Sequence, residues 1–160
     1  MPAEIRALYL STGHDFRGRH GLGRLDHGIE QVQEVRCVAG QGLEGDRYFG
    51  YKEDYKGQIT FFDWKVYEQL VSNYPDRRVD PSLLRRNVLI DGVDLNSLVA
   101  RRFRVGGVLF EGSEECAPCY WMNDAIGPGA EDALRGRGGL RARIVEGGVL
   151  RAGAAELTLE

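Results

Sequence analysis

The chain has 160 residues, a formal net charge of −3 and 42% hydrophobic residues. This length predicts a single domain over residues 1–160 with a sizeable core. The charge gives no basic signature of a nucleic-acid-binding protein, and no apolar run is long enough to cross a bilayer.

The cysteine and glycine contents narrow the class of protein further. An odd number of cysteines, 3, argues against a secreted disulfide framework, and the sequence shows no signal peptide. We therefore expect a cytoplasmic protein with reduced thiols and no membrane partner. The 22 glycines cluster in short turns, which predicts many short strands with sharp connections.

The first part of the chain is predicted to contain strands at residues 5–12, 29–38 and 58–62. All three histidines, His14, His20 and His27, fall in a polar stretch between the first two strands. Their spacing fits neither a helix face nor a strand face, so we interpret them as loop residues rather than metal ligands.

Residues 40–48 hold glycines at positions 40, 42 and 45, followed by Asp46 and Arg47. Such glycines allow close approach of the backbone to a ligand, and successive N–H groups can form an anion-binding nest. The stretch lacks the Gly-Lys-Ser/Thr of a nucleotide-binding P-loop. The alternative is a structural turn held by a network around Asp46 and Arg47.

A helix is predicted over residues 64–73, with Asp63 as its N-cap. A buried strand at 88–90 follows, bounded by the turn signal Asp91-Gly92. Arg85, Arg86 and Asn87 lie just ahead of this strand. They are either ligands for a phosphate or carboxylate, or a solvated strand end.

The second half predicts a helical turn at 95–99, a hairpin over 102–111, a short helix at 130–135 and strands at 140–145, 149–151 and 155–159. The expected fold class is mainly β (α+β). The architecture is an antiparallel, barrel-like β domain with two or three short helices.

Cys116 and Cys119 belong to the sequence Cys-Ala-Pro-Cys at a predicted strand-to-helix junction. Pro118 fits the first turn of a helix over residues 119–124, which puts Cys119 near the positive end of a helix dipole. That position favours the thiolate, the form that attacks electrophiles and binds soft metals. The alternative is a buried cysteine that fills a small gap in the core.

Read together, residues 42–47, 85–95 and 116–119, with the glycine-rich stretches at 127–129 and 137–142, resemble a MOSC domain. This domain occurs at the C-terminus of molybdenum cofactor sulfurases. The resemblance extends from about residue 5 to residue 158. It implies a β-rich, MOSC-like fold and a role with the molybdenum cofactor, a molybdopterin-type dithiolene that carries a phosphate or nucleotide.

The resemblance also implies roles for particular residues. Cys119 falls on the position of the family's functional thiol, which carries sulfur or binds molybdenum. Arg85 and Asn87 fall on an arginine–asparagine motif expected to contact the cofactor. The further candidates for cofactor binding are Arg86, Gly45, Asp46, Arg47, Arg137 and Gly138.

These features give one leading hypothesis and two alternatives. The first is a molybdenum-dependent oxidoreductase that reduces N-hydroxylated or related N–O compounds. It needs a separate reductase as electron donor, because the sequence has no flavin, haem or iron–sulfur motif. The second is a sulfur carrier, in which a cysteine desulfurase loads a persulfide onto Cys119 for a sulfur acceptor. The third, a zinc or thiol-redox module, has only one Cys-x-x-Cys pair to support it.

Overall fold

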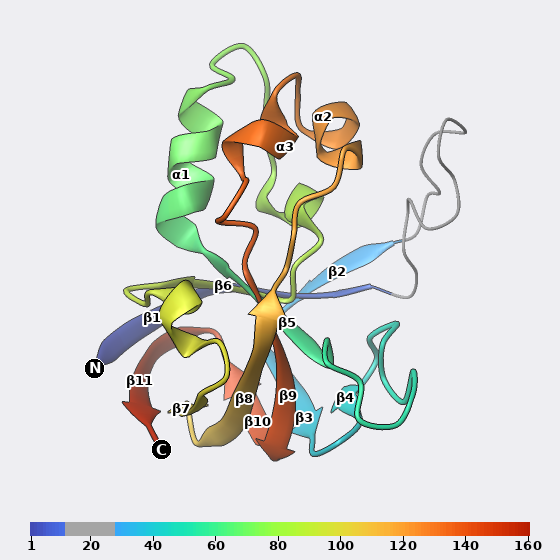
Figure 1. Ribbon diagram of the computed structural model, residues 1–160, viewed down its shortest axis with the longest axis vertical. Coiled ribbons are helices and arrows are strands. Elements are labelled where there is room, and N and C mark those ends of the chain that lie inside the picture. The colour runs from blue at the N-terminus through green and yellow to red at the C-terminus, as the bar shows by residue number, and fades with distance from the viewer. Residues whose placement is uncertain (12–27) are drawn as a thin grey trace.

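The computed structural model describes residues 1–11 and 28–160 (Figure 1). His14, His20 and His27 lie outside the described residues, so their interpretation as loop residues stays a prediction.

Within the described residues, seven strands close into a barrel in the order β11-β7-β8-β9-β5-β6-β1, and β11 pairs with β1 to complete the ring. The strands are β1 (Pro2–Ser11), β5 (Ile59–Asp63), β6 (Val88–Asp91), β7 (Arg102–Val105), β8 (Val108–Glu115), β9 (Leu140–Glu146) and β11 (Gly153–Leu159). Neighbours in the ring are antiparallel except for β5 and β6, which are parallel. The prediction of a mainly antiparallel barrel is confirmed.

A smaller sheet flanks the barrel. It contains β3 (Glu34–Val38), β4 (Gly42–Leu43) and β10 (Gly148–Arg151), with β3 in the middle. The single strand predicted over residues 29–38 is wrong in this respect. It divides at Gln33 into β2 (Ile29–Val32) and β3, because β2 pairs with β1 whereas β3 pairs with β10.

The barrel interior is filled by apolar side chains that alternate with outward-facing polar ones. Phe61, Phe103 and Phe110 pack together in its centre with ring centroids 5.3–5.8 Å apart. On β9 the inward residues are buried while Arg141 and Arg143 face outward, as the predicted alternation requires.

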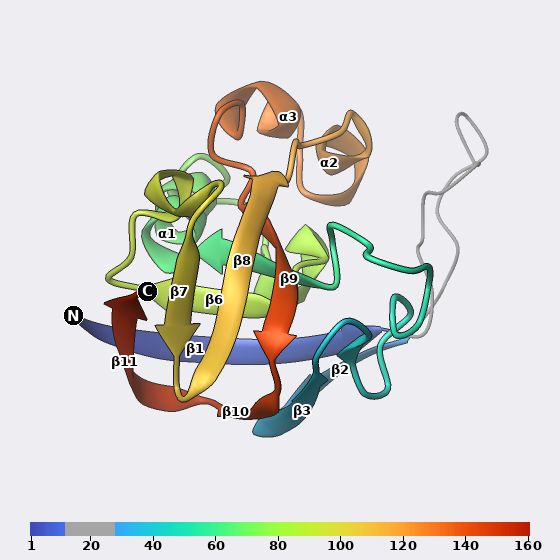
Figure 2. The same ribbon diagram turned by 60° about the horizontal axis from the view of Figure 1, so that its bottom comes forward.

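Three short helices cover one side of the barrel, as Figures 1 and 2 show from two directions. They are α1 (Trp64–Ser72), α2 (Trp121–Ala125) and α3 (Ala130–Ala133), with 3₁₀ helices η1 (Pro81–Leu84) and η2 (Leu95–Leu98) nearby. Asp63 caps α1 as predicted, because its side chain accepts a hydrogen bond from the N–H of Lys65.

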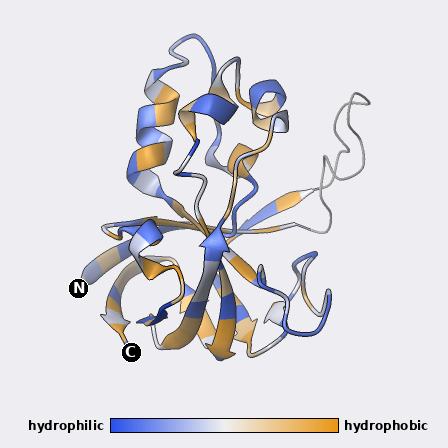
Figure 3. Cartoon of the chain, in the orientation of Figure 1, coloured by the Kyte–Doolittle hydropathy of each residue, from blue (hydrophilic) through white to orange (hydrophobic). Residues whose placement is uncertain are grey.

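A second apolar cluster fixes these helices on the barrel. Leu70 of α1, Met122 of α2 and Leu134 pack with residues of η1 and β6. In Figure 3 the helices carry apolar residues on some faces and polar residues on others, which is typical of helices packed on one side only. No helix in the described part of the chain is long and apolar enough to span a membrane.

Candidate functional site

Asp46 and Asn87, which belong to different sequence motifs, meet in the structure. One carboxylate oxygen of Asp46 accepts hydrogen bonds from the backbone N–H of Ser11 (3.0 Å) and from Nδ2 of Asn87 (3.4 Å). The other oxygen accepts from the N–H of Tyr48 (3.4 Å). Both Asp46 and Asn87 are buried. The glycine-rich turn after β4 is therefore tied to the start of β6.

The other hydrogen-bonding positions of the Asn87 side-chain amide are also occupied. Its oxygen accepts from the N–H (3.0 Å) and the hydroxyl (3.1 Å) of Thr60, and Nδ2 donates to the carbonyl of Tyr9 (3.1 Å). With Asp46 as the second acceptor, both donors and both lone pairs of the amide have partners. Asn87 thus joins β1, β5 and the glycine-rich turn, and acts on the site through its neighbours.

Arg85 and Arg47 both reach Ser11, the last residue of β1. Arg85 follows η1 with a left-handed backbone (φ 59°) and its Nη2 donates to the Ser11 hydroxyl (2.9 Å). The N–H of Arg47 donates to the Ser11 carbonyl (2.6 Å), and its guanidinium lies 4.8 Å from the centre of the Tyr48 ring. Ser11 and both arginines line one small cavity with Asn87. The Arg85 guanidinium contacts the Ser11 hydroxyl, whereas Arg47 contacts Ser11 through its backbone N–H. The cavity has a volume of only about 10 Å³, the space of about one water molecule.

Ser11 was missed by the sequence analysis. It carries no signal in the sequence, because it lies at a strand end beside the histidine-containing stretch and belongs to none of the motifs. Only the fold brings it to Arg85, Arg47 and Asp46.

Cys119 and Cys116 have different environments. Cys116 is buried directly after β8, whereas Cys119 is exposed. The helix predicted over residues 119–124 is wrong at its start, because α2 begins only at Trp121. The Cys119 carbonyl accepts from the N–H of Met122 (3.0 Å), so Cys119 belongs to the turn that leads into α2. Its exposure, and not the dipole of a five-residue helix, makes Cys119 the accessible thiol.

Arg141 lies beside the buried Cys116. Burial of Arg141, the largest single effect, lowers its pKa, but Cys116, Tyr55 and Glu114 together raise it above the ordinary value. Glu114 accepts from Arg141 (3.3 Å) and pairs with Lys56 at 2.9 Å. This chain of charges runs from the cysteine segment to the loop that precedes β5.

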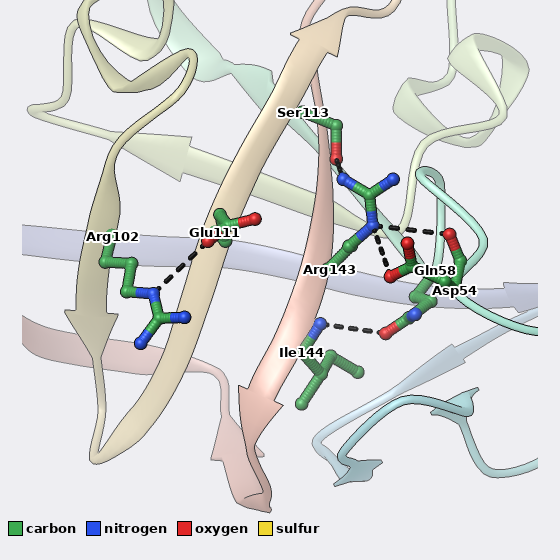
Figure 4. Close-up of polar contacts among 7 residues, drawn as sticks. All are labelled: Asp54, Gln58, Arg102, Glu111, Ser113, Arg143 and Ile144. Atoms are coloured by element: carbon green, nitrogen blue, oxygen red, sulfur yellow. Dashed lines mark hydrogen bonds and ion pairs between the residues drawn. The ribbon is translucent and has the colours of Figure 1, made fainter.

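That loop, residues 48–57, carries three tyrosines packed on one another. The ring centroids of Tyr48, Tyr51 and Tyr55 lie 4.9–5.4 Å apart. Arg143 anchors the loop to β9 through an ion pair with the Asp54 carboxylate at 2.9 Å (Figure 4). The loop lies next to the segment that carries Cys116, because Arg141 interacts with both Tyr55 and Cys116.

Arg137 and Gly138 are adjacent but serve different surroundings. The Arg137 guanidinium donates to the Gln69 side chain (2.7 Å) and to the Ala133 carbonyl (2.9 and 3.1 Å). It lines a separate cavity of about 240 Å³ beside α1. A Cβ at Gly138, in contrast, would lie 2.1 Å from the Cys116 carbonyl oxygen, so Gly138 packs directly against the cysteine segment.

The comparison with protein families gives one match, to the model described as MOSC domain, over residues 44–155. The chain belongs to the MOSC domain family. A comparison with curated proteins found no match.

Solved structures show the same MOSC fold. The YuaD protein from Bacillus subtilis is 20% identical, covers 100% of this chain and 97% of its own, and has a TM-score of 0.76. YiiM from Geobacillus stearothermophilus is 18% identical, with coverage of 99% and 75% and a TM-score of 0.69. YiiM from Escherichia coli is 20% identical, with coverage of 99% and 70% and a TM-score of 0.65.

The residues of this MOSC domain fit a molybdenum cofactor in two respects. The exposed Cys119 sulfur is a soft ligand of the kind that sulfur-binding transition metals such as molybdenum accept. The side chains of Arg85 and Arg47 are cations of the kind that bind phosphate, and they line a cavity that, at about 10 Å³, cannot itself enclose one. Among residues 1–11 and 28–160, no group of three or more His, Cys, Asp or Glu side chains could hold a metal ion by itself. A zinc module therefore has no support in the described chain.

Proposed function

We propose that this MOSC-domain protein binds the molybdenum cofactor and reduces small N-hydroxylated or related N–O compounds. Cys119 is the metal ligand in this proposal, and a separate reductase supplies the electrons. The observation that carries it is the exposed thiol of Cys119 on a segment that Arg86 binds, directly beside Arg85, whose guanidinium binds Ser11.

Each residue has a defined task in the proposal. Arg85 and Arg47 bind the anionic end of the cofactor, and Ser11 orients Arg85 through its hydroxyl. Asp46 and Asn87 hold the glycine-rich turn, including Gly45, in place. The bound cofactor supplies the redox-active metal, and Cys119 supplies a thiolate to it.

The test is the metal content of protein purified without oxygen from cells supplied with molybdate. We expect near-stoichiometric molybdenum in the wild type and in Cys116→Ala, and its loss in Cys119→Ala. The loaded protein, given a chemical reductant, should then reduce N-hydroxylated compounds. Wild-type protein without molybdenum, or equal metal in the Cys119 variant, would contradict the proposal.

The exposure of Cys119 also favours a second candidate, the sulfur carrier. A cysteine desulfurase needs access to the acceptor sulfur, which Cys119 offers and Cys116 does not. Incubation with such an enzyme and cysteine should add ~32 Da, one sulfur atom, to Cys119. Mass spectrometry of Cys119→Ser is the control. An unmodified wild type would exclude this role.

A further inference from the structure

The buried Arg86 side chain joins its own segment to two others, the cysteine segment and the glycine-rich stretch at residues 138–139. Its Nη1 donates to the Leu84 carbonyl (2.9 Å), its Nε to the Gly138 carbonyl (3.0 Å) and its Nη2 to the Cys116 carbonyl (3.4 Å). The side chain is only 8% exposed. A buried guanidinium requires acceptors for its donors, and here backbone carbonyl groups provide them.

The junction around Arg86 is closely packed on its other side as well. The N–H of Cys116 donates to the Gly139 carbonyl (2.8 Å). A Cβ at Gly138 would lie 2.1 Å from the Cys116 oxygen, and one at Gly139 would lie 2.2 Å from the Phe61 oxygen. The backbone that precedes Cys119 is therefore held between Arg86 and the two glycines.

Arg85 and Arg86 are neighbours in the chain, but their side chains make different contacts. Arg85 reaches Ser11, at the small cavity that Arg47 and Asn87 also line, and Arg86 reaches the Cys116 carbonyl. Because one dipeptide makes both contacts, it determines how far the thiol segment lies from the cationic cavity.

We infer that Arg86 is a positioning residue, which fixes the Cys119 segment relative to Arg85 by binding the carbonyl oxygens of Cys116 and Gly138. The resemblance suggested Arg86 as a cofactor contact. Its hydrogen bonds go to backbone carbonyl groups instead, so we assign it the task of holding the backbone of the site in place. The inference concerns the thiol on which the proposed function rests, but its test needs no cofactor.

The experiment compares the wild type with Arg86→Gln, Arg86→Lys and Gly138→Ala. It measures local amide hydrogen exchange by mass spectrometry and alkylation of the buried Cys116 by iodoacetamide in native protein. We expect Arg86→Gln to raise exchange in residues 116–120 and 136–139 and to speed Cys116 alkylation roughly tenfold, because three buried carbonyl groups lose a partner. Arg86→Lys should recover part of the protection, since it keeps the charge without the planar fork.

Gly138→Ala perturbs the same junction from the opposite side, so it should raise exchange in the same two segments. Arg102→Gln is the matched control. It removes an exposed arginine that pairs with Glu111 on the outer barrel wall (Figure 4), but should leave residues 116–120 unchanged.

Unchanged exchange in residues 116–120, or an increase spread evenly over the barrel, would overturn the inference. If Arg86→Gln does not fold, Arg86→Lys and Gly138→Ala decide the question by the same two measurements. A wild type that contains no molybdenum would contradict the proposed function and leave this result intact, so the two failures are distinguishable.

Discussion

Nδ2 of Asn87 lies 3.4 Å from a carboxylate oxygen of Asp46, and this contact joins the glycine-rich turn to the strand that follows Arg85 and Arg86. Both side chains are buried, and the Asn87 amide is saturated with hydrogen bonds. Asn87 therefore holds these two segments together, because the polar atoms of its amide already bind protein groups.

Asn87→Ala should therefore act mainly on stability. It removes the acceptor of the Thr60 N–H and hydroxyl and the amide donor to the Tyr9 carbonyl. The Asp46 carboxylate loses one hydrogen bond but keeps those from the N–H groups of Ser11 and Tyr48. We expect a cost of about 2–3 kcal/mol of unfolding free energy. Urea unfolding measures this. Asn96→Ala, which removes an exposed hydrogen bond to the Gly136 carbonyl, is the control and should cost less than ~1 kcal/mol. Equal losses in the two variants would contradict the structural role of Asn87.

The three cysteines should differ in reactivity as they differ in exposure. In native protein near neutral pH, iodoacetamide should modify Cys119 and leave the buried Cys37 and Cys116 unmodified. All 3 should react after unfolding in urea. Peptide mass spectrometry identifies the modified positions. Modification of Cys116 as fast as Cys119 would mean that the cysteine segment is open in solution.

Stability should fall at alkaline pH because of buried acids. Burial raises the pKa of Cys37 to about 12, from an ordinary value of 9.0. Burial, with Asp80 and Tyr67, raises the pKa of Tyr9 to about 12 as well. Below pH 9.0 both states keep the Cys37 proton, and its contribution is fully present. Above that pH the unfolded chain loses the proton first, so unfolding free energy falls by about 1.4 kcal/mol per pH unit for each such group.

Cys37→Ala removes one of these groups and should flatten the decline in stability between pH 9.0 and about 12. Urea unfolding at several pH values in this window measures the slope. Cys119→Ala, at an exposed position, should leave the slope unchanged. An identical slope in wild type and Cys37→Ala would show that Cys37 is not protected from ionisation by the fold.

Arg85 should matter for cofactor retention. Arg85→Gln removes the guanidinium that binds the Ser11 hydroxyl, and we expect molybdenum per protein to fall at least roughly tenfold, as loss of a charge-assisted contact predicts. Elemental analysis measures the metal. Arg102→Gln is the control, because Arg102 lies on β7 and pairs with Glu111 on the outer barrel wall (Figure 4). An equal molybdenum content in both variants would show that Arg85 does not bind the cofactor.

The sequence by itself determined the class of fold and most of its elements. The alternation of apolar and polar residues on β9 and the capping signal at Asp63 are local, so they could be recognised without the fold. The same holds for the motifs that contain Asp46, Arg85 and Cys119. Their order along the chain sufficed for the resemblance to the family that the comparison then confirmed.

Only the tertiary structure decided which of these residues act together and in what direction they face. Ser11 joins the site, and the long strand over residues 29–38 divides, because of pairing with segments distant in the sequence. Adjacent residues also separate: Arg85 reaches Ser11, while Arg86 binds the Cys116 backbone. The physical reason is that a buried polar group forms its hydrogen bonds with the groups that the fold brings next to it. These partners come from segments distant in the sequence, so the order of residues along the chain does not specify them.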